Sequence, residues 1–470
     1  MVRTKVVATV GPASSSEEML LELIAAGTDT FRLNMSHGDL DEKRALIRRI
    51  RELTKSGKAE PFCILGDLGG PKVRVGKLTG GKVKLEEGNT VFLTSDEITG
   101  DAGRIHVGYE KLGAGLKRGS RILIDDGMME LKVISPKAGE VQAKVVKGGM
   151  LLEHKGVNFP GMPLELPTMT EKDFEDLKLL VDEGVDYIAL SFVRKASDPL
   201  MLKRKIAEIG SNIPVISKIE RPEALREIKE IIKNSDAVMV ARGDLGVEMP
   251  LEKVPFVQKR IIRLCHEMKK PVITATQMLE SMIWNPRPTR AEASDVAGAV
   301  LDGTDALMLS GETASGKYPI EAALMMARIA ANAENHLYNP AHYASEPGIP
   351  AEVIAISACR SADALGAKAI ICFTRSGDTA LHVSKYRPRT AIIAATPSES
   401  TFRRMRLYFG VIPMIVRQES NTDAMIREVE RAALSRGLVK PGDAILVTLG
   451  VPCGSGTNLL KVHHVGQSWA

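Results

Sequence analysis

Eight short apolar runs, each of a length suited to a buried β-strand, alternate with amphipathic helical stretches over most of this chain. The runs are residues 5–10, 30–34, 61–67, 187–191, 214–218, 237–241, 272–275 and 306–309. Eight parallel strands that alternate with helices close a (β/α)8 TIM barrel, whose active site lies at the carboxyl ends of the strands. The pattern therefore predicts an α/β fold built around such a barrel.

Helix start signals support this alternation. A serine cluster at 14–16 precedes a helical stretch at 17–26, a second helical stretch covers 41–55, and Thr170 begins an amphipathic helix where the alternation resumes. A last helix of this region is predicted at 320–338.

The alternation is interrupted between about residues 71 and 167. This segment is rich in glycine and holds short strands of alternating polarity, such as GKVKLEEG and MELKVI. We expect an all-β insertion, a small barrel, that is joined at Gly69, Gly70 and Pro71 and closes over the site as a lid.

After residue 350 helices and apolar runs alternate again, which predicts a separate open α/β domain. We therefore predict three domains. They are the barrel at 1–70 and 168–342, the lid at 71–167 and the C-terminal α/β domain at 343–470.

Composition narrows the possible partners. The 63 Lys and Arg residues nearly balance the 58 Asp and Glu residues, so a net charge of +5 does not predict a nucleic-acid partner. Five cysteines without a CxxC pair favour free thiols in a reducing compartment over disulfides or a zinc site. The chain lacks a signal-peptide pattern and a long apolar span, so we expect a cytoplasmic protein without a membrane partner.

The segment SKIER supplies the first candidate chemistry. Lys218 and Glu220 are two residues apart on an extended segment and share one side, and Asp244 ends the next strand. Two carboxylates beside an ammonium suit Mg²⁺ or Mn²⁺ together with a phosphate or carboxylate ligand. A structural ion pair between Lys218 and Glu220 is the alternative.

Further candidates end the neighbouring strands. In ARGDLG, the amide of Gly243 beside Asp244 suits an anion, although a tight turn is the alternative for Gly246. Thr276 is a candidate because of its place at a strand end, and a capping role is the alternative.

The second and third strands add Arg32 as a candidate phosphate ligand and Asn34 and Ser36 as neutral oxygen ligands for a cation. His37 is ambiguous. Asp67, Lys72 and Arg74 follow on the way into the insertion.

Two glycine-containing loops need separate interpretation. Residues 311–317, GETASGK, resemble a P-loop, but Tyr318 stands where Ser or Thr must bind Mg²⁺, so we reject that interpretation. In the last domain, a hydroxyl-rich loop before a helix suits a regulatory phosphate, with a simple helix cap as the alternative. Its residues are Thr374, Arg375, Ser376, Gly377 and Thr379.

Taken in order, several motifs resemble those of the pyruvate kinase family over essentially the whole chain. They are RLNMSHG, GDLGGPKVR, GVNFPG, SFVRKA, SKIER, ARGDLGVE, ATQMLESM, NPRPTRAE and LMLSGETASGKYP. The resemblance implies Mg²⁺-dependent transfer of the phosphoryl group of phosphoenolpyruvate to ADP, giving pyruvate and ATP. It also implies a C-terminal effector domain and a homotetramer.

The resemblance also implies residue roles. Glu220 and Asp244 would hold Mg²⁺, Lys218 would neutralise the phosphoryl group and the enolate, and amides around Gly243 would bind the substrate carboxylate. A water near Thr276 would protonate the enolate. The remaining implied residues are Ser310 and Glu312 for the proton relay, and Arg32, Asn34, His37, Arg74 and Lys155 for substrate or nucleotide.

One departure from the family concerns K⁺. Relatives that depend on K⁺ carry glutamate at the position of Lys72 and threonine at that of Leu68. We expect the Lys72 ammonium to replace K⁺ beside Asp67, Asn34 and Ser36, and activity not to require K⁺. Gly69 is a second departure, since many relatives carry a longer side chain there.

The loop at 374–379 does not distinguish a sugar phosphate, such as fructose 1,6-bisphosphate or ribose 5-phosphate, from AMP. Two alternatives to a kinase remain at this stage. One is another metal-dependent barrel enzyme, such as a carbon–carbon lyase, and the other is a non-catalytic binding protein.

Overall fold

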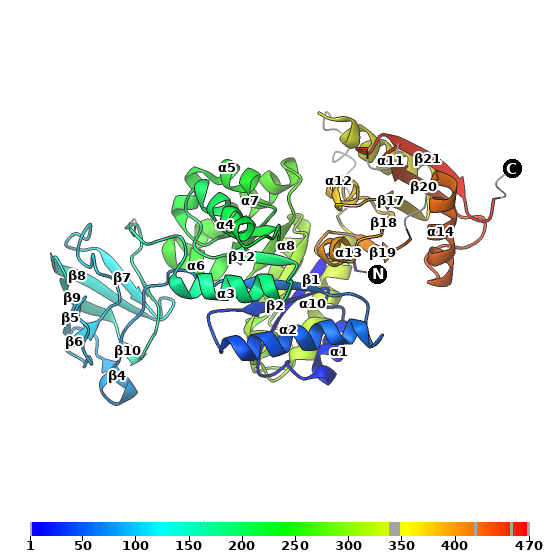
Figure 1. The fold of residues 1–470 in the computed structure, drawn as a ribbon. Coiled ribbons are helices and arrows are strands. Elements are labelled where there is room, and N and C mark those ends of the chain that lie inside the picture. The colour runs from blue at the N-terminus through cyan, green and yellow to red at the C-terminus, as the bar shows by residue number, and fades with distance from the viewer. Residues whose placement is uncertain (1, 163, 338–347, 418–420, 452–454, 468–470) are drawn as a thin grey trace.

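The computed structural model describes residues 2–162, 164–337, 348–417, 421–451 and 455–467. Three bodies lie in a row, with the β-rich insertion at one end, the barrel in the middle and the C-terminal α/β body at the other end (Figure 1). In the parts of the chain that are described, no helix is long and apolar enough to span a bilayer.

The central body is a closed barrel of eight parallel strands, as predicted. The strands follow one another around the barrel in the order β1, β16, β15, β14, β13, β12, β3 and β2. Every strand is buried on both faces, which explains why these runs are continuously apolar. The bounds are β1 Lys5–Val10, β2 Thr30–Asn34, β3 Cys63–Asp67, β12 Tyr187–Leu190, β13 Val215–Ile219, β14 Ala237–Ala241, β15 Val272–Ala275 and β16 Ala306–Leu309.

Helices surround this barrel, and their ends follow the capping signals. Ser16 caps α1 with its side chain, and Thr170 and Thr289 form capping boxes at α3 and α8. The helix predicted at 320–338 ends at Glu334, and residue 338 lies outside the described residues. The α-helices are α1 Glu17–Ala25, α2 Leu40–Lys55, α3 Glu171–Asp182, α4 Ser197–Glu208, α5 Ile228–Asn234, α6 Arg242–Glu248, α7 Val254–Glu267, α8 Arg290–Leu301, α9 Gly311–Ala314 and α10 Pro319–Glu334.

The insertion after β3 has its own apolar core. Six strands form a sheet in the order β11, β7, β8, β9, β5 and β6, and β10 pairs with β4 separately. Bridges from Arg74 to Gly156, next to β11, and from Val75 to Val107, next to β6, connect the two edges of this sheet, which agrees with the predicted small barrel. The bounds are β4 Lys82–Leu85, β5 Thr90–Thr94, β6 Arg104–His106, β7 Arg121–Ile124, β8 Met129–Lys137, β9 Glu140–Lys147, β10 Gly149–Leu152 and β11 Val157–Asn158.

The C-terminal body alternates helices and strands as predicted, and its parallel strands lie in the order β19, β18, β17 and β20. An additional edge strand, β21, pairs antiparallel with β20 and was not predicted, because its residues lack a clear apolar pattern. The bounds are α11 Pro350–Leu365, β17 Ala369–Phe373, α12 Asp378–Lys385, β18 Ala391–Thr396, α13 Glu399–Met405, β19 Val411–Ile415, α14 Thr422–Ser435, β20 Ala444–Leu449 and β21 Leu459–His464.

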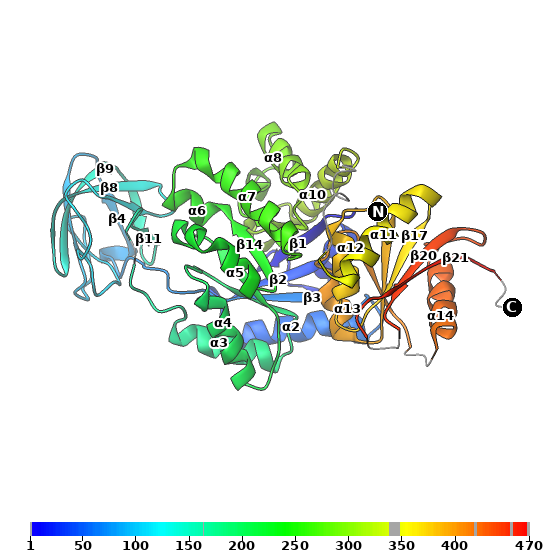
Figure 2. The ribbon, with the colours of Figure 1, turned by 90° about the horizontal axis from the view of Figure 1, so that it is seen from above.

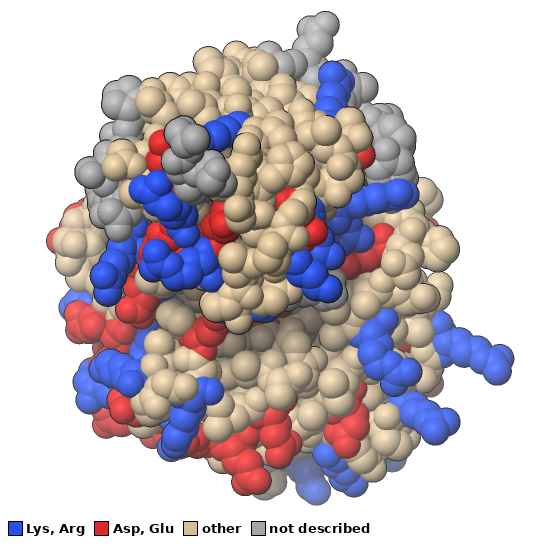
Figure 3. All heavy atoms as spheres, turned by 90° about the vertical axis from the view of Figure 1, so that its right-hand side faces the viewer, with Lys and Arg blue, Asp and Glu red and all other residues tan. Residues whose placement is uncertain are grey.

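The C-terminal body packs on the amino ends of the barrel strands, away from the lid (Figure 2). Buried ion pairs join Asp305, which precedes β16, to Lys385 at the end of α12 and to Arg387 just after it. Seen from the C-terminal end, basic and acidic side chains are intermingled (Figure 3). The carboxyl ends of the barrel strands thus face the lid.

Candidate active site

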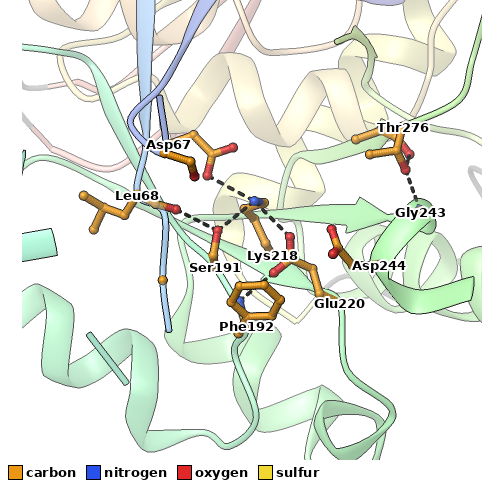
Figure 4. A network of polar contacts seen from close by, with 12 residues as sticks. Asp67, Leu68, Ser191, Phe192, Lys218, Glu220, Gly243, Asp244 and Thr276 are labelled. Atoms are coloured by element: carbon orange, nitrogen blue, oxygen red, sulfur yellow. Dashed lines mark hydrogen bonds and ion pairs between the residues drawn. The ribbon is translucent and has the colours of Figure 1, made fainter. Parts of the chain in front are cut away.

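Lys218 lies in β13 near its carboxyl end, at the mouth of the barrel (Figure 4). Its ammonium donates to Ser191 Oγ at 2.7 Å. The same nitrogen lies 2.9 Å from Glu220 Oε1 and 3.2 Å from Asp67 Oδ1. Because Asp67 ends β3 and Ser191 follows β12, three neighbouring strands converge on this lysine.

The charges in this cluster control one another. Burial lowers the pKa of the Lys218 ammonium, but the carboxylates of Asp67 and Glu220 outweigh burial and raise that pKa above its ordinary value. Burial and the nearby Asp244 carboxylate raise the pKa of Glu220, against the effect of Lys218. A buried carboxyl group of this kind is stabilised in its charged form by a second cation, which fits the predicted metal ligand.

Arg32 from β2 is a second positively charged side chain that pairs with Asp67, in addition to Lys218. Its Nε donates to Asp67 Oδ2 at 2.7 Å, and one terminal nitrogen donates to Thr9 Oγ1 at 3.0 Å. Burial would raise the pKa of Asp67, but Lys218 and Arg32 lower it below its ordinary value. Asp67 is therefore a charged carboxylate that already has two cationic partners.

Helix α6 begins on the other side of Glu220 and carries Gly243 and Asp244. The amide of Gly243 donates to Thr276 Oγ1 at 2.6 Å, and this hydroxyl donates to the carbonyl of Ala275. Thr276 has φ of 69°, a conformation that a β-branched residue adopts only when its surroundings enforce it. The structure thus brings Gly243 and Thr276 together. A substrate carboxylate bound at the Gly243 amide would accept from the same N–H group that the Thr276 hydroxyl accepts from.

Lys72 does not lie where the sequence analysis expected it. Its ammonium lies 3.3 Å from Asp244 Oδ1 and 3.4 Å from Asp126 Oδ1 in the lid. Burial lowers the pKa of Lys72, and the two aspartates outweigh burial and raise it. The reason for the different placement is local: Asp67 is already neutralised, and Gly156 leaves room for the lysine stem, since a Cβ there would lie 2.6 Å from Lys72 Cε.

The two other predicted cation ligands contact each other. Asn34 Oδ1 accepts the amide of Ser36 at 3.1 Å, which closes a short turn after β2. His37 is exposed beside this turn, and burial of part of the ring, together with Arg74, lowers the pKa of His37. The Lys72 ammonium pairs with Asp244 and Asp126 instead of Asn34 and Ser36, so the expected replacement of K⁺ at these two residues lacks geometric support.

Two predicted nucleotide ligands belong to the lid. Arg74 donates to the carbonyl of His154 at 2.9 Å, and Lys155 forms an ion pair with Asp125 at 2.8 Å. Arg74 lies on the segment that enters the lid after β3, and Lys155 lies between β10 and β11.

Ser310 and Glu312 follow β16, and their contacts are mainly structural. The Glu312 carboxylate accepts the amides of Leu279 at 3.1 Å and Ser310 at 2.7 Å. Burial raises the pKa of Glu312 above its ordinary value. This carboxyl group therefore joins the ends of two neighbouring strand loops.

A cavity of about 840 Å³ lies between lid and barrel, and its wall includes Lys72, Arg121, Asp126, Asp244, Thr276 and Glu312. Across the described ranges, no three His, Cys, Asp or Glu side chains converge as a complete metal site. The two carboxylates of Glu220 and Asp244 nevertheless fit Mg²⁺, because Mg²⁺ commonly binds one or two protein carboxylates and takes its other ligands from water and substrate.

Comparison with known proteins decides the family. The model described as "Pyruvate kinase, barrel domain" matches residues 1–323, and "Pyruvate kinase, alpha/beta domain" matches residues 352–463. The chain belongs to the pyruvate kinase family. It is therefore a phosphotransferase whose substrates are phosphoenolpyruvate and ADP.

Individual pyruvate kinases align with the full length of this chain. Those of Staphylococcus aureus strains MRSA252 and USA300 are each 46% identical over 479 aligned positions, covering 100% of this chain and 82% of the relative. A crystal structure of a pyruvate kinase from Cryptosporidium parvum superposes with a TM-score of 0.93 at 37% identity. That alignment covers 99% of this chain and 96% of the other. Neither the lyase nor the non-catalytic alternative is supported.

Sequence reasoning missed two residues of this pyruvate kinase site. Ser191 accepts from Lys218 and donates to the carbonyl of Leu68 at 2.7 Å, and the amide of Phe192 donates to Glu220 Oε2 at 2.7 Å. The position of Ser191 at a strand end was a usable signal. The Phe192 amide left none, because any residue type supplies a backbone N–H group.

Two arginines of the cavity wall were also missed. Arg242 pairs with Asp295 at 2.7 Å and donates to the carbonyl of Thr276 at 2.8 Å, while Arg121 lies on the lid strand β7. Arg242 stands in the ARGDLG motif, so its position was visible although its contacts were not. The segment 311–317 follows the barrel strand β16, which agrees with rejecting a P-loop.

The predicted effector residues gather at a second cavity, of about 400 Å³, in the C-terminal body. Thr374 Oγ1 accepts the amide of Gly377 at 2.8 Å, and the hydroxyls of Thr379 and Thr457 lie 2.6 Å apart. Arg375 is exposed at this cavity, and Ser376 donates to the carboxylate of Asp378, which the sequence analysis did not consider.

Proposed function

We propose that phosphoryl transfer takes place in the cavity between lid and barrel, with Mg²⁺ or Mn²⁺ held by Glu220 and Asp244. The contacts of Lys218 carry this proposal, because its buried ammonium is fixed beside Glu220 at the barrel mouth. When bound, the divalent ion neutralises negative charge on phosphoryl and enolate oxygens.

The roles of the side chains follow from charge and position. Lys218 stabilises negative charge on the transferring phosphoryl group and then on the enolate oxygen, and Ser191 keeps its ammonium in place. Amides around Gly243 bind the substrate carboxylate. The further proposed contacts with substrate or nucleotide phosphates come from Arg32, Asn34, His37, Arg74 and Lys155.

The enolate then takes a proton at carbon. We assign the ordering of the proton-donating water to Thr276, whose hydroxyl lies at the Gly243 amide. Ser310 and Glu312 support this step by fixing the loop after β16.

The test is a coupled assay of pyruvate formation from phosphoenolpyruvate, ADP and Mg²⁺. Lys218→Met should lower kcat by about 100-fold or more, because a positioned charge that stabilises a transition state has an effect of this size. Lys203→Met is the matched control, since Lys203 is ion-paired with Asp236 on the barrel away from the cavity. Similar activities of the two variants would contradict the proposed role of Lys218.

We also propose that activity does not require K⁺. Support comes from the positive charge that Lys72 adds to the cavity wall beside Asp244 and Asp126, although this ammonium does not lie beside Asp67, Asn34 and Ser36. Turnover in tetramethylammonium buffer should change little on addition of KCl, whereas Lys72→Glu should acquire K⁺ activation. Lys77→Glu is the control on an exposed lid position. Negligible turnover without K⁺ in the parent enzyme would overturn the proposal.

For the cavity in the C-terminal body, we propose a phosphorylated activator, either a sugar phosphate or AMP. The hydroxyls of Thr374, Ser376 and Thr379 and the guanidinium of Arg375 line this cavity and supply donors for a phosphate group. Calorimetric titration with fructose 1,6-bisphosphate, ribose 5-phosphate and AMP should detect binding that Thr379→Val weakens. No binding of any of the three would contradict this assignment.

We further propose a cytoplasmic homotetramer with the predicted domain boundaries at 70/71, 167/168 and 342/343, the last of which lies outside the described residues. Large exposed apolar side chains support two contact surfaces, with Leu251, Phe256 and Trp284 on the barrel and Val353 and Val462 on the C-terminal body. Four described cysteines are buried free thiols, which fits a reducing compartment. Light scattering after gel filtration should give four times the chain mass.

A further inference from the structure

A buried polar cluster joins the lid to the barrel next to the proposed metal site. Glu248 is the last residue of α6, and its Oε1 accepts from Asn158 Nδ2 at 2.7 Å and from an Arg221 terminal nitrogen at 2.8 Å. The side chains of Arg221 and Glu248 are 8% and 2% exposed, and Asn158 is buried as well. A carboxylate with two donors at this depth holds its partners in one arrangement.

Each member of the cluster belongs to a different functional segment. Asn158 ends β11, which returns the chain from the lid, and it pairs with Leu123 of β7. Arg221 directly follows Glu220. Glu248 lies four residues after Asp244, one turn along the same helix. The cluster therefore touches the lid and both segments that carry the proposed metal carboxylates.

The surrounding contacts extend this connection. The strand β7 that pairs with Asn158 leads to Asp125 and Asp126, which both adopt positive φ. Asp126 contacts Lys72 near Asp244. On the other side, the Arg221 guanidinium lies 5.9 Å from the ring centre of Phe192, whose amide binds Glu220. Direct contacts thus run from the lid strand β7 to Glu220 and to α6.

We propose that Asn158, Arg221 and Glu248 are positioning residues that couple the placement of the lid to the geometry of the Glu220 and Asp244 carboxylates. This inference rests on the proposed metal assignment. Asn158 and Glu248 touch each other rather than the reacting groups, so their effect is on metal and substrate affinity and on lid placement. Burial raises the pKa of Glu248 above its ordinary value, although Arg221 and Asn158 oppose that effect.

The test uses Mn²⁺ binding measured by electron paramagnetic resonance at pH 8 without substrates, alongside the KM for phosphoenolpyruvate. Asn158→Asp places a second carboxylate against Glu248 and should weaken Mn²⁺ binding by about tenfold, as expected for residues that orient metal ligands. The negative charge that Asn158→Asp adds would by itself tighten Mn²⁺ binding. Weaker Mn²⁺ binding in this variant would therefore indicate that the Glu220 and Asp244 carboxylates are displaced. Asn234→Asp, which changes an asparagine bonded to the carbonyl of Ala196, is the control.

The exchanged pair, Asn158→Asp combined with Glu248→Gln, restores one amide, one carboxylate and one guanidinium. It should return both Mn²⁺ affinity and the KM toward the parent values, and circular dichroism establishes that each variant is folded. Mn²⁺ affinity unchanged or tighter in Asn158→Asp, or an exchanged pair no better than the single variant, overturns the coupling. If Glu220→Gln also leaves Mn²⁺ affinity unchanged, the metal assignment itself is overturned together with this inference.

Discussion

Asp305 supports the joint between the barrel and the C-terminal body, and removing its charge should be more damaging than removing one of its cationic partners. Its carboxylate contacts the Lys385 ammonium, an Arg387 nitrogen at 2.8 Å and the amide of Val272 at 2.7 Å. All three charged side chains are at most 2% exposed. Lys385 and Arg387 lower the pKa of Asp305 despite its burial, so the carboxylate is charged.

The expected magnitudes follow from the charge that each change leaves behind. Asp305→Asn leaves two buried cations without a negative partner, which lowers the free energy of unfolding by about 3–5 kcal/mol. Lys385→Met leaves the Asp305–Arg387 pair intact and should cost about 1–2 kcal/mol. The double variant Asp305→Asn with Lys385→Met should be more stable than Asp305→Asn alone, because it removes one of the two unpaired buried cations. Burial lowers the pKa of Lys385, because a buried ammonium loses its hydration.

Differential scanning calorimetry at pH 7.5 measures this effect. A loss of 1 kcal/mol lowers Tm by about 2–4 °C for a domain of the size of the barrel, so Asp305→Asn should lower Tm by about 6 °C or more. Asp236→Asn is the matched control, because Asp236 also accepts a backbone amide, from Val215, but its partner Lys203 is partly exposed. Equal losses for Asp305→Asn and Lys385→Met, or strictly additive losses in the double variant, would refute the reasoning.

Two more outcomes are expected. Burial and Arg387 lower the pKa of His266 to about 3. Between pH 6 and 4 His266 is therefore neutral in the folded protein, whereas in the unfolded chain its imidazole binds a proton. Stability should therefore fall as pH decreases from 6 to 4, and His266→Gln should remove about 1.4 kcal/mol per pH unit from that slope in urea unfolding, an unchanged slope being the contrary result. Gly113 has φ of 86°, and a Cβ there would lie 2.0 Å from the carbonyl oxygen of Lys137. Gly113→Ala should thus destabilise the lid by about 2 kcal/mol in thermal melts, and a Tm equal to that of the parent would contradict this.

The barrel was predictable because its signal is local. Each strand is an apolar run whose length and spacing are visible in the sequence, and capping residues such as Ser16 and Thr170 mark the helix starts. Lys218, Glu220 and Asp67 could be placed together because the carboxyl ends of parallel strands meet at the barrel mouth. The edge strand β21 was missed because one exposed face and several polar residues leave it without an apolar pattern.

Contacts between distant segments were not predictable. Lys72 was assigned to Asp67 by position in the chain, whereas the space beside Gly156 directs its ammonium to Asp244. A related signal went unused: Asp29, Asp186, Asp236 and Asp305 each directly precede a barrel strand or lie next to its start, and each accepts a backbone amide from a neighbouring strand. Which of these is buried by the C-terminal body depends on the docking of the two bodies, and no local pattern encodes that.

The most direct test of the proposed active site is a crystal structure with Mn²⁺ and oxalate, a planar analogue of the pyruvate enolate. The account predicts an anomalous Mn²⁺ peak bonded to the carboxylates of Glu220 and Asp244, with oxalate completing the coordination and the Lys218 ammonium beside an oxalate oxygen. A peak bonded to Asp67 and Asn34 instead, or oxalate bound away from Lys218, would contradict the account.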